Sequence, residues 1–127
     1  MSVRLCNVVI NARDTRVLAD FWCAALGWSV VDEEDGVLSL ADPEQTWPVL
    51  DLVPGAGEKT GHNRVHLDLR ADGGSTQSAE VERLLALGAR RADVGQGDDV
   101  SWVVLADPEG NEFCVLSRTA DEAAADG

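Results

Sequence analysis

The sequence predicts an α+β fold assembled from two copies of one unit, each running strand, helix, strand, strand, strand. The first observation is an identical pentapeptide, Leu-Ala-Asp-Pro-Glu, at residues 40–44 and again at residues 105–109 of a chain of 127 residues. The second is an Ala-Leu-Gly tripeptide upstream of each pentapeptide, at residues 25–27 and 86–88. Because these segments recur in the same order, they indicate an internal duplication.

The first strand of each copy is predicted from alternating polarity. Apolar and polar residues alternate over residues 4–14 and over residues 64–72, and both segments end in an Asp. Alternation with a period of two is typical of a half-buried strand, and Asp is favoured at a helix N-cap. Each segment is therefore interpreted as a strand that leads into a helix.

The helix of each copy is predicted from apolar residues spaced by three and four. These residues form a single stripe that ends at the Ala-Leu-Gly tripeptide, whose Gly tolerates the positive φ common just past a helix end. The stripes consist of Leu18, Phe21, Trp22, Ala25 and Leu26 in the first copy, and of Val81, Leu84, Leu85 and Leu87 in the second.

Three short strands are expected after each helix. The Asp-Pro-Glu tripeptide falls between the last two strands of each copy, where Pro presets φ and Asp accepts local backbone hydrogen bonds. The predicted strands are residues 28–32, 37–41 and 48–53 in the first copy, and residues 91–94, 100–106 and 112–116 in the second.

The repeat units span residues 3–53 and 64–118 and are expected to form a single domain over residues 1–118. A chain of this length buries about two-thirds of its unfolded surface. Residues 54–63 contain three Gly and one Pro and are interpreted as a linker. Residues 119–127 are an Ala, Asp and Glu tail with little to bury and are expected to be disordered.

Composition excludes two classes of partner. The chain has 10 basic and 23 acidic residues, a net charge of −13, which repels nucleic acid and anionic membrane surfaces. Its three Cys are an odd number without zinc-binding spacing, and no segment resembles an apolar leader or a membrane span. We therefore expect a soluble, cytoplasmic protein with reduced thiols.

Strand parity collects polar side chains on the faces opposite the predicted core. The duplication pairs Asn7 with His66 and Asp51 with Cys114, so these four side chains are expected to converge on one curved sheet. Alternation alone equally fits ordinary solvent-facing positions. The polar faces carry Asn7, Asn11, Asp51, His66, Asp68, Arg70, Glu112 and Cys114.

Two motifs in this duplicated frame resemble the vicinal oxygen chelate superfamily. They are His-Leu-Asp-Leu at residues 66–69 and Asp-Pro-Glu-Gly-Asn-Glu-Phe at residues 107–113. The resemblance covers residues 3–118 and is to the glyoxalase-like branch, alongside bleomycin-resistance proteins and extradiol dioxygenases. It implies curved mixed sheets around a cup, with helices on the outer face, and a divalent metal in the cup that chelates two adjacent oxygens of the substrate.

The resemblance also implies four ligand positions for that metal, which fall on Asn7, Asp51, His66 and Cys114. His66 matches the family, and Asp51 is one methylene shorter than the usual Glu. Asn7 is a weak neutral ligand, and Cys114 replaces a hard carboxylate with a soft thiolate, so the usual set is incomplete. A metal on His66 and Asp51 is one expectation, including zinc with Cys114 and a water, and a degenerate metal-free site is the other.

Without a metal, Asp51 and His66 still have a chemical use. A carboxylate that holds one imidazole nitrogen leaves the other free to act as a base on a carbonyl compound. The alternative for His66 is a purely structural strand histidine. Cys114 beside His66 suggests a nucleophile pair, although a Cys in a strand is more often a small apolar residue. His62, in the linker, is expected to be solvated.

Four Trp and no Tyr are a further peculiarity of the composition. Trp22 lies on the helix stripe and is expected in the core. Trp47 and Trp102 are expected at a pocket rim, where an indole offers a flat face for stacking, although a core position fits both equally well.

The sequence therefore predicts a homodimeric glyoxalase-like protein that binds a small molecule. Its polar cup would contain Asn7, Asp51, His66, Asp68, Arg70 and Cys114, with His66 and Asp51 as the candidate catalytic residues. Metal-dependent lyase, isomerase or dioxygenase-like chemistry on an oxygen-bearing molecule is one form of this prediction. Ordinary glyoxalase activity is disfavoured, because the family's metal-held carboxylate base would sit at Cys114.

Two other functions remain open at this point. One is a metal-free, drug-sequestering protein of the bleomycin-resistance kind, in which Trp47 and Trp102 stack on a flat cationic ligand that the acidic protein attracts. The other is an interaction module that kept the fold and lost the site. The sequence names no substrate and leaves catalysis itself undecided.

Overall fold

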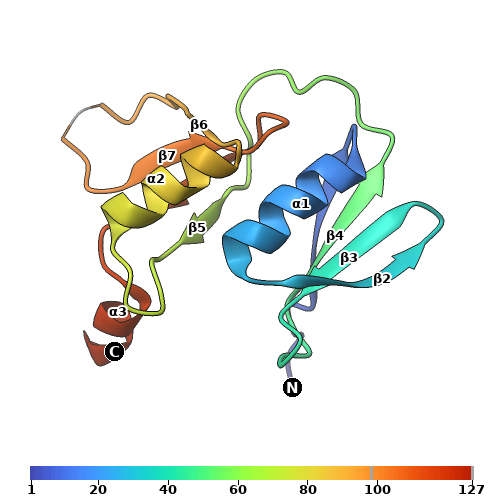
Figure 1. The fold of residues 1–127 in the computed structure, drawn as a ribbon, viewed down its shortest axis with the longest axis horizontal. Coiled ribbons are helices and arrows are strands. Elements are labelled where there is room, and N and C mark those ends of the chain that lie inside the picture. The colour runs from blue at the N-terminus through green and yellow to red at the C-terminus, as the bar shows by residue number, and fades with distance from the viewer. Residues whose placement is uncertain (98, 127) are drawn as a thin grey trace. The chain divides into compact units, whose positions relative to one another are not determined.

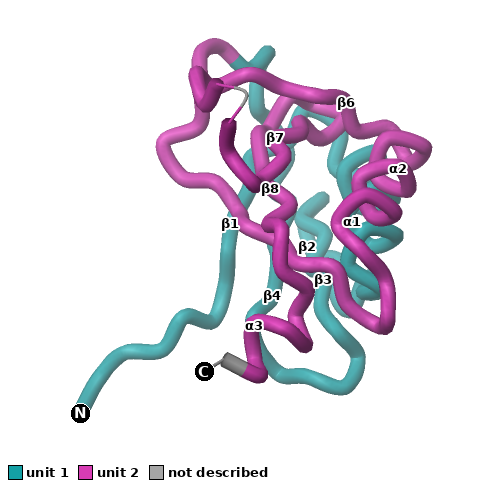
Figure 2. Tube along the Cα trace, turned by 90° about the vertical axis from the view of Figure 1, so that its left-hand side faces the viewer, with its two compact units in different colours: residues 1–59 teal, residues 60–127 magenta. Residues whose placement is uncertain are grey.

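The structure, a computed structural model, describes residues 1–97 and 99–126. The chain divides into two compact units, Met1–Lys59 and Thr60–Gly127 (Figure 2). The division falls inside the segment that the sequence predicts to be a linker, residues 54–63.

The first unit is a four-stranded mixed sheet with one helix. Its elements are β1 (Asn7–Ala12), α1 (Thr15–Leu26), β2 (Ser29–Glu34), β3 (Val37–Ala41) and β4 (Val49–Pro54). The strand order is β1-β4-β3-β2, with β1 parallel to β4 and the other neighbours antiparallel. Helix α1 lies across one face of this sheet (Figure 1).

The second unit repeats this topology with shorter strands. It contains β5 (Leu67–Leu69), α2 (Gln77–Leu87), β6 (Arg90–Arg91), β7 (Val103–Ala106) and β8 (Glu112–Val115), in the order β5-β8-β7-β6. Strands β5 and β8 are parallel, as β1 and β4 are in the first unit. The prediction of two βαβββ units in an α+β fold is confirmed.

Helix α1 begins and ends where the sequence signals place its caps. The Asp14 carboxylate accepts hydrogen bonds from the backbone nitrogens of Arg16 and Val17, at 3.0 and 3.2 Å. Gly27 ends the helix with a φ of 70°, a left-handed conformation that Gly adopts without a Cβ clash. Leu18, Phe21 and Trp22 of the predicted apolar stripe are buried, whereas Ala25 and Leu26 at its C-terminal end are only half-buried.

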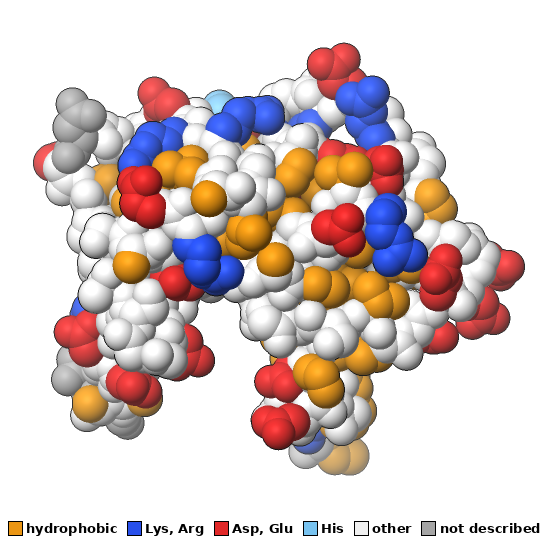
Figure 3. Space-filling model, viewed as in Figure 1, with side chains coloured by type: hydrophobic (Ala, Val, Ile, Leu, Met, Phe, Trp, Pro, Cys, Tyr) orange, Lys and Arg blue, Asp and Glu red, His pale blue; other side chains and the backbone are white. Residues whose placement is uncertain are grey.

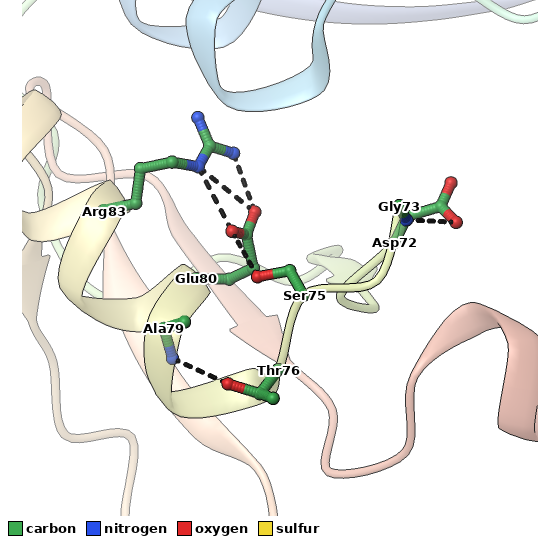
Figure 4. A network of polar contacts seen from close by, with 7 residues as sticks. All are labelled: Asp72, Gly73, Ser75, Thr76, Ala79, Glu80 and Arg83. Carbon is green, nitrogen blue, oxygen red and sulfur yellow. Dashed lines mark hydrogen bonds and ion pairs between the residues drawn. The ribbon is translucent and has the colours of Figure 1, made fainter.

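Helix α2 is capped differently from the prediction. Asp72 lies before the helix and accepts a hydrogen bond from Gly73 N at 2.9 Å, while Thr76 is the N-cap and accepts from Ala79 N at 3.2 Å (Figure 4). Two Gly with positive φ lengthen the turn and move the helix start beyond Asp72. Within the helix, Arg83 donates to Glu80 at 2.8 Å, and this hydrogen bond holds the pKa of Glu80 below its usual value.

The two Asp-Pro-Glu turns differ in burial. Asp107 is fully buried, and its carboxylate accepts from Glu109 N at 2.9 Å and from the backbone and side-chain nitrogens of Asn111 at 3.0 and 2.9 Å. Asp42 in the first unit is only half-buried and accepts from Glu44 N at 2.9 Å. The Asp of the second turn therefore accepts more hydrogen bonds than the Asp of the first. The second turn leads directly into β8.

The C-terminal tail, which the sequence analysis expects to be disordered, contains helix α3 (Ala120–Asp126). Thr119 Oγ1 accepts from Glu122 N at 3.1 Å, and Glu122 Oε1 accepts from Thr119 N at 2.9 Å. This reciprocal pair is a capping box, which favours a helix start at this position. The prediction of disorder gave more weight to the acidic composition of the tail than to this local signal. Ala120 N also donates to Ala71 O at 2.8 Å, which ties the helix to its unit.

Acidic side chains are spread over the face shown in Figure 3, with one concentration on it. On the face shown in Figure 3, many acidic side chains lie singly or near Lys and Arg, and they gather at the tip of the β2–β3 hairpin. Residues 32–35, which are all acidic, are exposed there. No helix in the described part of the chain is long and apolar enough to cross a membrane.

Candidate functional site

The second unit contains a pocket of about 580 Å³ on the polar face of its sheet. Asp68 on β5 lies opposite Cys114 on β8, and Cys114 lies opposite Val104 on β7, so neighbouring strands contribute to one wall. The polar lining side chains are His62, Asn63, His66, Asp68, Gln96, Glu112 and Cys114, and the apolar ones are Val94, Trp102, Val104 and Leu116.

Three of the side chains that line this pocket lie close together. His66 Nε2 is 3.2 Å from Asp68 Oδ1, and one ligand atom from each of His66, Asp68 and Cys114 lies within 4.8 Å of the others. Asp68 on β5 is paired with Cys114 on β8, and His66 lies just before β5, two residues from Asp68. Within this unit the carboxylate that holds His66 is therefore Asp68, whereas the sequence analysis assigned that role to Asp51.

The Cys114 thiol is poorly suited to nucleophilic chemistry. Its side chain is 7% exposed, and burial raises the pKa of the thiol. The negative charge of Asp68 and a hydrogen bond to that carboxylate raise this pKa further. Because the thiolate is the reactive form, Cys114 remains a protonated donor to Asp68 near neutral pH.

A second histidine lines the same pocket, which the sequence analysis did not foresee. His62 Nδ1 is 2.9 Å from Glu112 Oε1, and the other carboxylate oxygen accepts from Asn63 N at 3.0 Å. Glu112 is only 9% exposed, so these hydrogen bonds help to offset the cost of removing its carboxylate from water. The sequence feature that could have predicted such a contact is Glu112, since a carboxylate on a buried strand requires a hydrogen-bonding partner.

The first unit brings together the other pair of predicted site residues. Asp51 on β4 accepts from Asn7 Nδ2 at 2.8 Å and from Ser39 Oγ at 2.6 Å, so both of its oxygens are engaged. Asp51 and Ser39 also line a smaller pocket of about 310 Å³ with acidic walls. The convergence of Asn7 and Asp51 with His66 and Cys114 on one ligand remains a prediction.

The remaining predicted residues occupy three different environments. Trp102 lines the pocket of the second unit. Trp47 lies in the first unit, with the Arg4 guanidinium carbon 4.7 Å from its ring centroid, a cation–π contact. Arg70 donates to Arg118 O at 3.0 Å and is not among the described residues that line the second unit's pocket.

The donor atoms in the second unit fit a soft metal better than a hard one. An imidazole, a carboxylate and a thiol suit zinc, whereas magnesium and manganese prefer oxygen ligands. His66, Asp68 and Cys114 are within reach of such an ion, provided that the thiol loses its proton on binding.

Residues 7–116 match the family described as Glyoxalase-like domain, and the chain belongs to that family. The fold is accordingly the paired βαβββ fold of the glyoxalase, bleomycin resistance and dioxygenase superfamily, which confirms the resemblance inferred from the motifs. No curated protein shows a significant match in sequence.

Solved structures with the same fold differ widely in their named activities. A glyoxalase/bleomycin resistance protein/dioxygenase family enzyme from Burkholderia phytofirmans PsJN has a TM-score of 0.68 at 20% identity, covering 89% of this chain and 97% of that one. The trypanothione-dependent glyoxalase I of Leishmania major has a TM-score of 0.67 at 20% identity, covering 98% and 95%. The fosfomycin resistance protein FosX of Mesorhizobium loti has a TM-score of 0.69 at 14% identity, covering 98% and 99%. At these identities the likeness establishes the fold alone.

Proposed function

We propose that the pocket of the second unit binds a small organic molecule that is neutral or cationic. The observation that carries this proposal is the charge of the lining. Two carboxylates, Asp68 and Glu112, face the pocket, and no Lys or Arg occurs among its described lining residues. An anionic ligand would lose its hydration in this pocket without gaining a compensating cation.

The apolar part of the lining supports the same ligand class. Trp102 presents an indole for stacking, while Val104 and Leu116 provide apolar contact area. The pocket volume of about 580 Å³ lies within the range typical of sites for small organic molecules. In this proposal His66 is the central polar group, and Asp68 and Cys114 hydrogen-bond beside it.

This ligand class bears on the two functions that the sequence leaves open. A glutathione adduct is anionic, so the lining supports the view that ordinary glyoxalase chemistry is disfavoured. Sequestration of a flat cationic drug requires acidic walls and an aromatic face, both of which this pocket has. Trp102 is the stacking residue in that alternative, while Trp47 is already in contact with Arg4.

A matched set of aromatic fragments tests the proposal. Benzyl alcohol, benzylamine and benzoate have similar shapes and are neutral, cationic and anionic at neutral pH. We expect the first two to shift the NMR signals of Trp102 and Cys114 at lower concentrations than benzoate does. Substitution of Trp102→Ala should weaken both responses. Tighter binding of benzoate, or no response to any fragment, would contradict the proposed ligand class.

A metal-dependent enzyme is the second candidate, because the structure groups His66, Asp68 and Cys114 within 4.8 Å. A zinc ion held by these residues would polarise a carbonyl group of the bound ligand. Cobalt is a suitable probe, since cobalt bound to thiolate gives a charge-transfer absorption band. The band should appear on titration and be lost in Cys114→Ser, but persist in the control Cys6→Ser. Absence of the band and of bound zinc would favour the metal-free alternative.

A further inference from the structure

Gln77, the first residue of helix α2, is hydrogen-bonded to two chain segments that form the pocket wall of the second unit. Its side-chain nitrogen Nε2 donates to Ser101 O at 2.9 Å and to Val115 O at 3.0 Å. Ser101 is followed by Trp102 and Val115 by Leu116, and both of these following residues line the pocket. Gln77 is not among the described residues that line it. One amide group therefore holds the segments that supply the aromatic and the aliphatic part of the wall.

The two hydrogen bonds fall where the ladder between β7 and β8 ends. Strand β7 begins at Val103 and β8 ends at Val115, and these two residues form the last pair at this end. Trp102 and Leu116 lie just beyond that pair, where the ladder no longer fixes the distance between the strands. A primary amide has two N–H groups, so Gln77 is able to donate to both carbonyl oxygens at once. Gln77 thus joins the two segments at the open end of the ladder.

The position of Trp102 makes such a contact important for binding. Trp102 is 41% exposed and lies before β7 rather than within it. A partly exposed side chain on an irregular segment retains conformational freedom, and ordering it when a ligand binds costs free energy. Hydrogen bonds that fix the backbone at the preceding residue, Ser101, reduce this cost.

The start of α2, which carries Gln77, is itself held by local contacts. Thr76 is the N-cap and accepts from Ala79 N at 3.2 Å, and Ser75 Oγ donates to Glu80 Oε2 at 2.9 Å (Figure 4). Capping contacts of this kind stabilise the backbone of the first helical turn. The side chain of Gln77 therefore extends from a well-defined position toward the two carbonyl oxygens.

We propose that Gln77 is a positioning residue, which holds the Trp102 indole beside Leu116 and thereby determines how well the pocket binds a flat ring. The inference rests on the proposed function, since it concerns the stacking face of that same site. It narrows the ligand class to planar, ring-bearing molecules, because an indole held in one orientation has most contact with a ring that lies flat against it. Gln77 acts on the ligand only through the wall.

Two variants remove the hydrogen-bond donor in different ways. Gln77→Met keeps the approximate length of the side chain but has no N–H group. Gln77→Glu presents a carboxylate that only accepts hydrogen bonds, while its negative charge favours the first turn of a helix. A role limited to the stability of α2 would therefore make Gln77→Glu harmless, whereas the positioning role makes it damaging. Ser78→Met, at the next and exposed position of α2, is the matched control.

The first measurement needs no ligand. The indole N–H of Trp102 gives an NMR signal of its own, which is assigned by its loss in Trp102→Ala. We expect this signal to shift and broaden in Gln77→Met and in Gln77→Glu, because the ring then samples more than one orientation. The signal of Trp47, in the first unit, should stay unchanged, and Ser78→Met should leave every indole signal in place. An unchanged Trp102 signal in both Gln77 variants would overturn the inference.

The second measurement compares benzyl alcohol with cyclohexylmethanol, whose saturated ring is similar in size but not flat. Gln77 can restrain the wall by no more than its hydrogen bonds contribute, so Gln77→Met should raise the Kd of benzyl alcohol by about fivefold. The Kd of cyclohexylmethanol should change less. In the Trp102→Ala background Gln77→Met should have no further effect, because the two residues act as a unit. Equal losses in both backgrounds would show that Gln77 does not act through Trp102.

The two measurements separate this inference from the proposed function. If the wild-type protein binds none of the fragments but the Trp102 signal responds to the Gln77 variants, the proposed function fails and the positioning of Trp102 stands. If benzyl alcohol binds Gln77→Met and Gln77→Glu as tightly as the wild type, the proposed function stands and the inference fails. The melting temperature of each variant confirms that folded proteins are compared, and Gln77→Glu alone suffices if Gln77→Met does not fold.

Discussion

At the scale of single residues, the histidines of the second unit differ in what holds them. His66 immediately precedes the short strand β5 and contacts Asp68, which is itself half-exposed, whereas His62 lies on a loop and contacts the buried Glu112. The exposed fraction of a ring therefore does not indicate how firmly the ring is held. His62 is the more exposed of the two histidines, but its partner Glu112 is buried and also hydrogen-bonded to Asn63 N. A histidine's function depends on the environment of its partner as much as on its own.

His66 is expected to be the residue most sensitive for ligand binding. His66→Ala should raise the dissociation constant of benzylamine by roughly tenfold, while changing the free energy of unfolding by less than about 1 kcal/mol, because its side chain is half-exposed. The measurements are an NMR titration and thermal unfolding. An unfolded variant whose remaining folded fraction binds normally would show that His66 is structural.

The protonation of Cys114 yields a separate prediction. Because the Asp68 charge raises the pKa of the thiol, Asp68→Asn should lower that pKa and increase the thiolate fraction at a given pH. Alkylation of Cys114 by iodoacetamide, followed by peptide mass spectrometry, should therefore be faster in Asp68→Asn than in the wild-type protein. Asp72→Asn, at a turn of the same unit, is the control. Equal rates in Asp68→Asn and the wild type would mean that burial alone protects the thiol.

At the scale of elements, the two Asp-Pro-Glu turns have the same sequence but differ in burial and in the hydrogen bonds that their Asp accepts. The β7–β8 turn is organised around the buried Asp107, and the corresponding turn of the first unit depends less on Asp42. This difference places the greater constraint on the turn that leads into β8. Strand β8 carries Glu112 and Cys114, so the turn fixes where the second unit's pocket residues begin.

The two Asp-Pro-Glu turns allow a matched comparison, in which the same substitution is made in each turn. Asp107→Ala leaves the part-buried nitrogens of Glu109 and Asn111 without the acceptor that Asp107 provides, and it should cost about 3 kcal/mol of unfolding free energy. Asp42→Ala removes an equivalent Asp from the half-buried turn and should cost about 1 kcal/mol or less. Denaturant unfolding of both variants measures the difference. Equal losses would show that burial of Asp107 does not determine its contribution.

At the scale of the whole molecule, two predictions concern how the units are used. The sequence predicts that Asp51 of the first unit and His66 of the second serve one ligand. If so, Asp51→Asn and His66→Ala should have non-additive effects on benzylamine binding, with a coupling of about 0.5 kcal/mol or more in a double-mutant cycle. Strict additivity would indicate that each unit binds independently.

The other prediction is that the protein is a homodimer. In the part of the chain that the structure describes, each unit has a four-stranded open sheet with two edge strands, and a second copy is one means of covering such edges. Light scattering at micromolar concentration should give about twice the mass of the 13.5 kDa chain. A monomer over the whole concentration range would contradict this prediction.

Local patterns in the sequence were sufficient to predict the repeat, the order of its elements and the polar face of each sheet. Such features depend on periodicity and on cap and turn residues, which act over a few positions. The same patterns identified His66, Asp68 and Cys114 as sharing a face. Where local signals conflicted, the prediction failed, as in the tail, where composition concealed the capping box of α3.

Only the tertiary structure decided which side chains became partners. His62 pairs with Glu112, which is distant along the chain, and Asp51 is occupied by Asn7 and Ser39 from neighbouring strands. These contacts depend on strand register and on the path of a loop, neither of which has a local sequence signature. The sequence by itself determined the fold and the chemistry available on its polar faces, while the pairing of charges across strands decided how that chemistry is arranged.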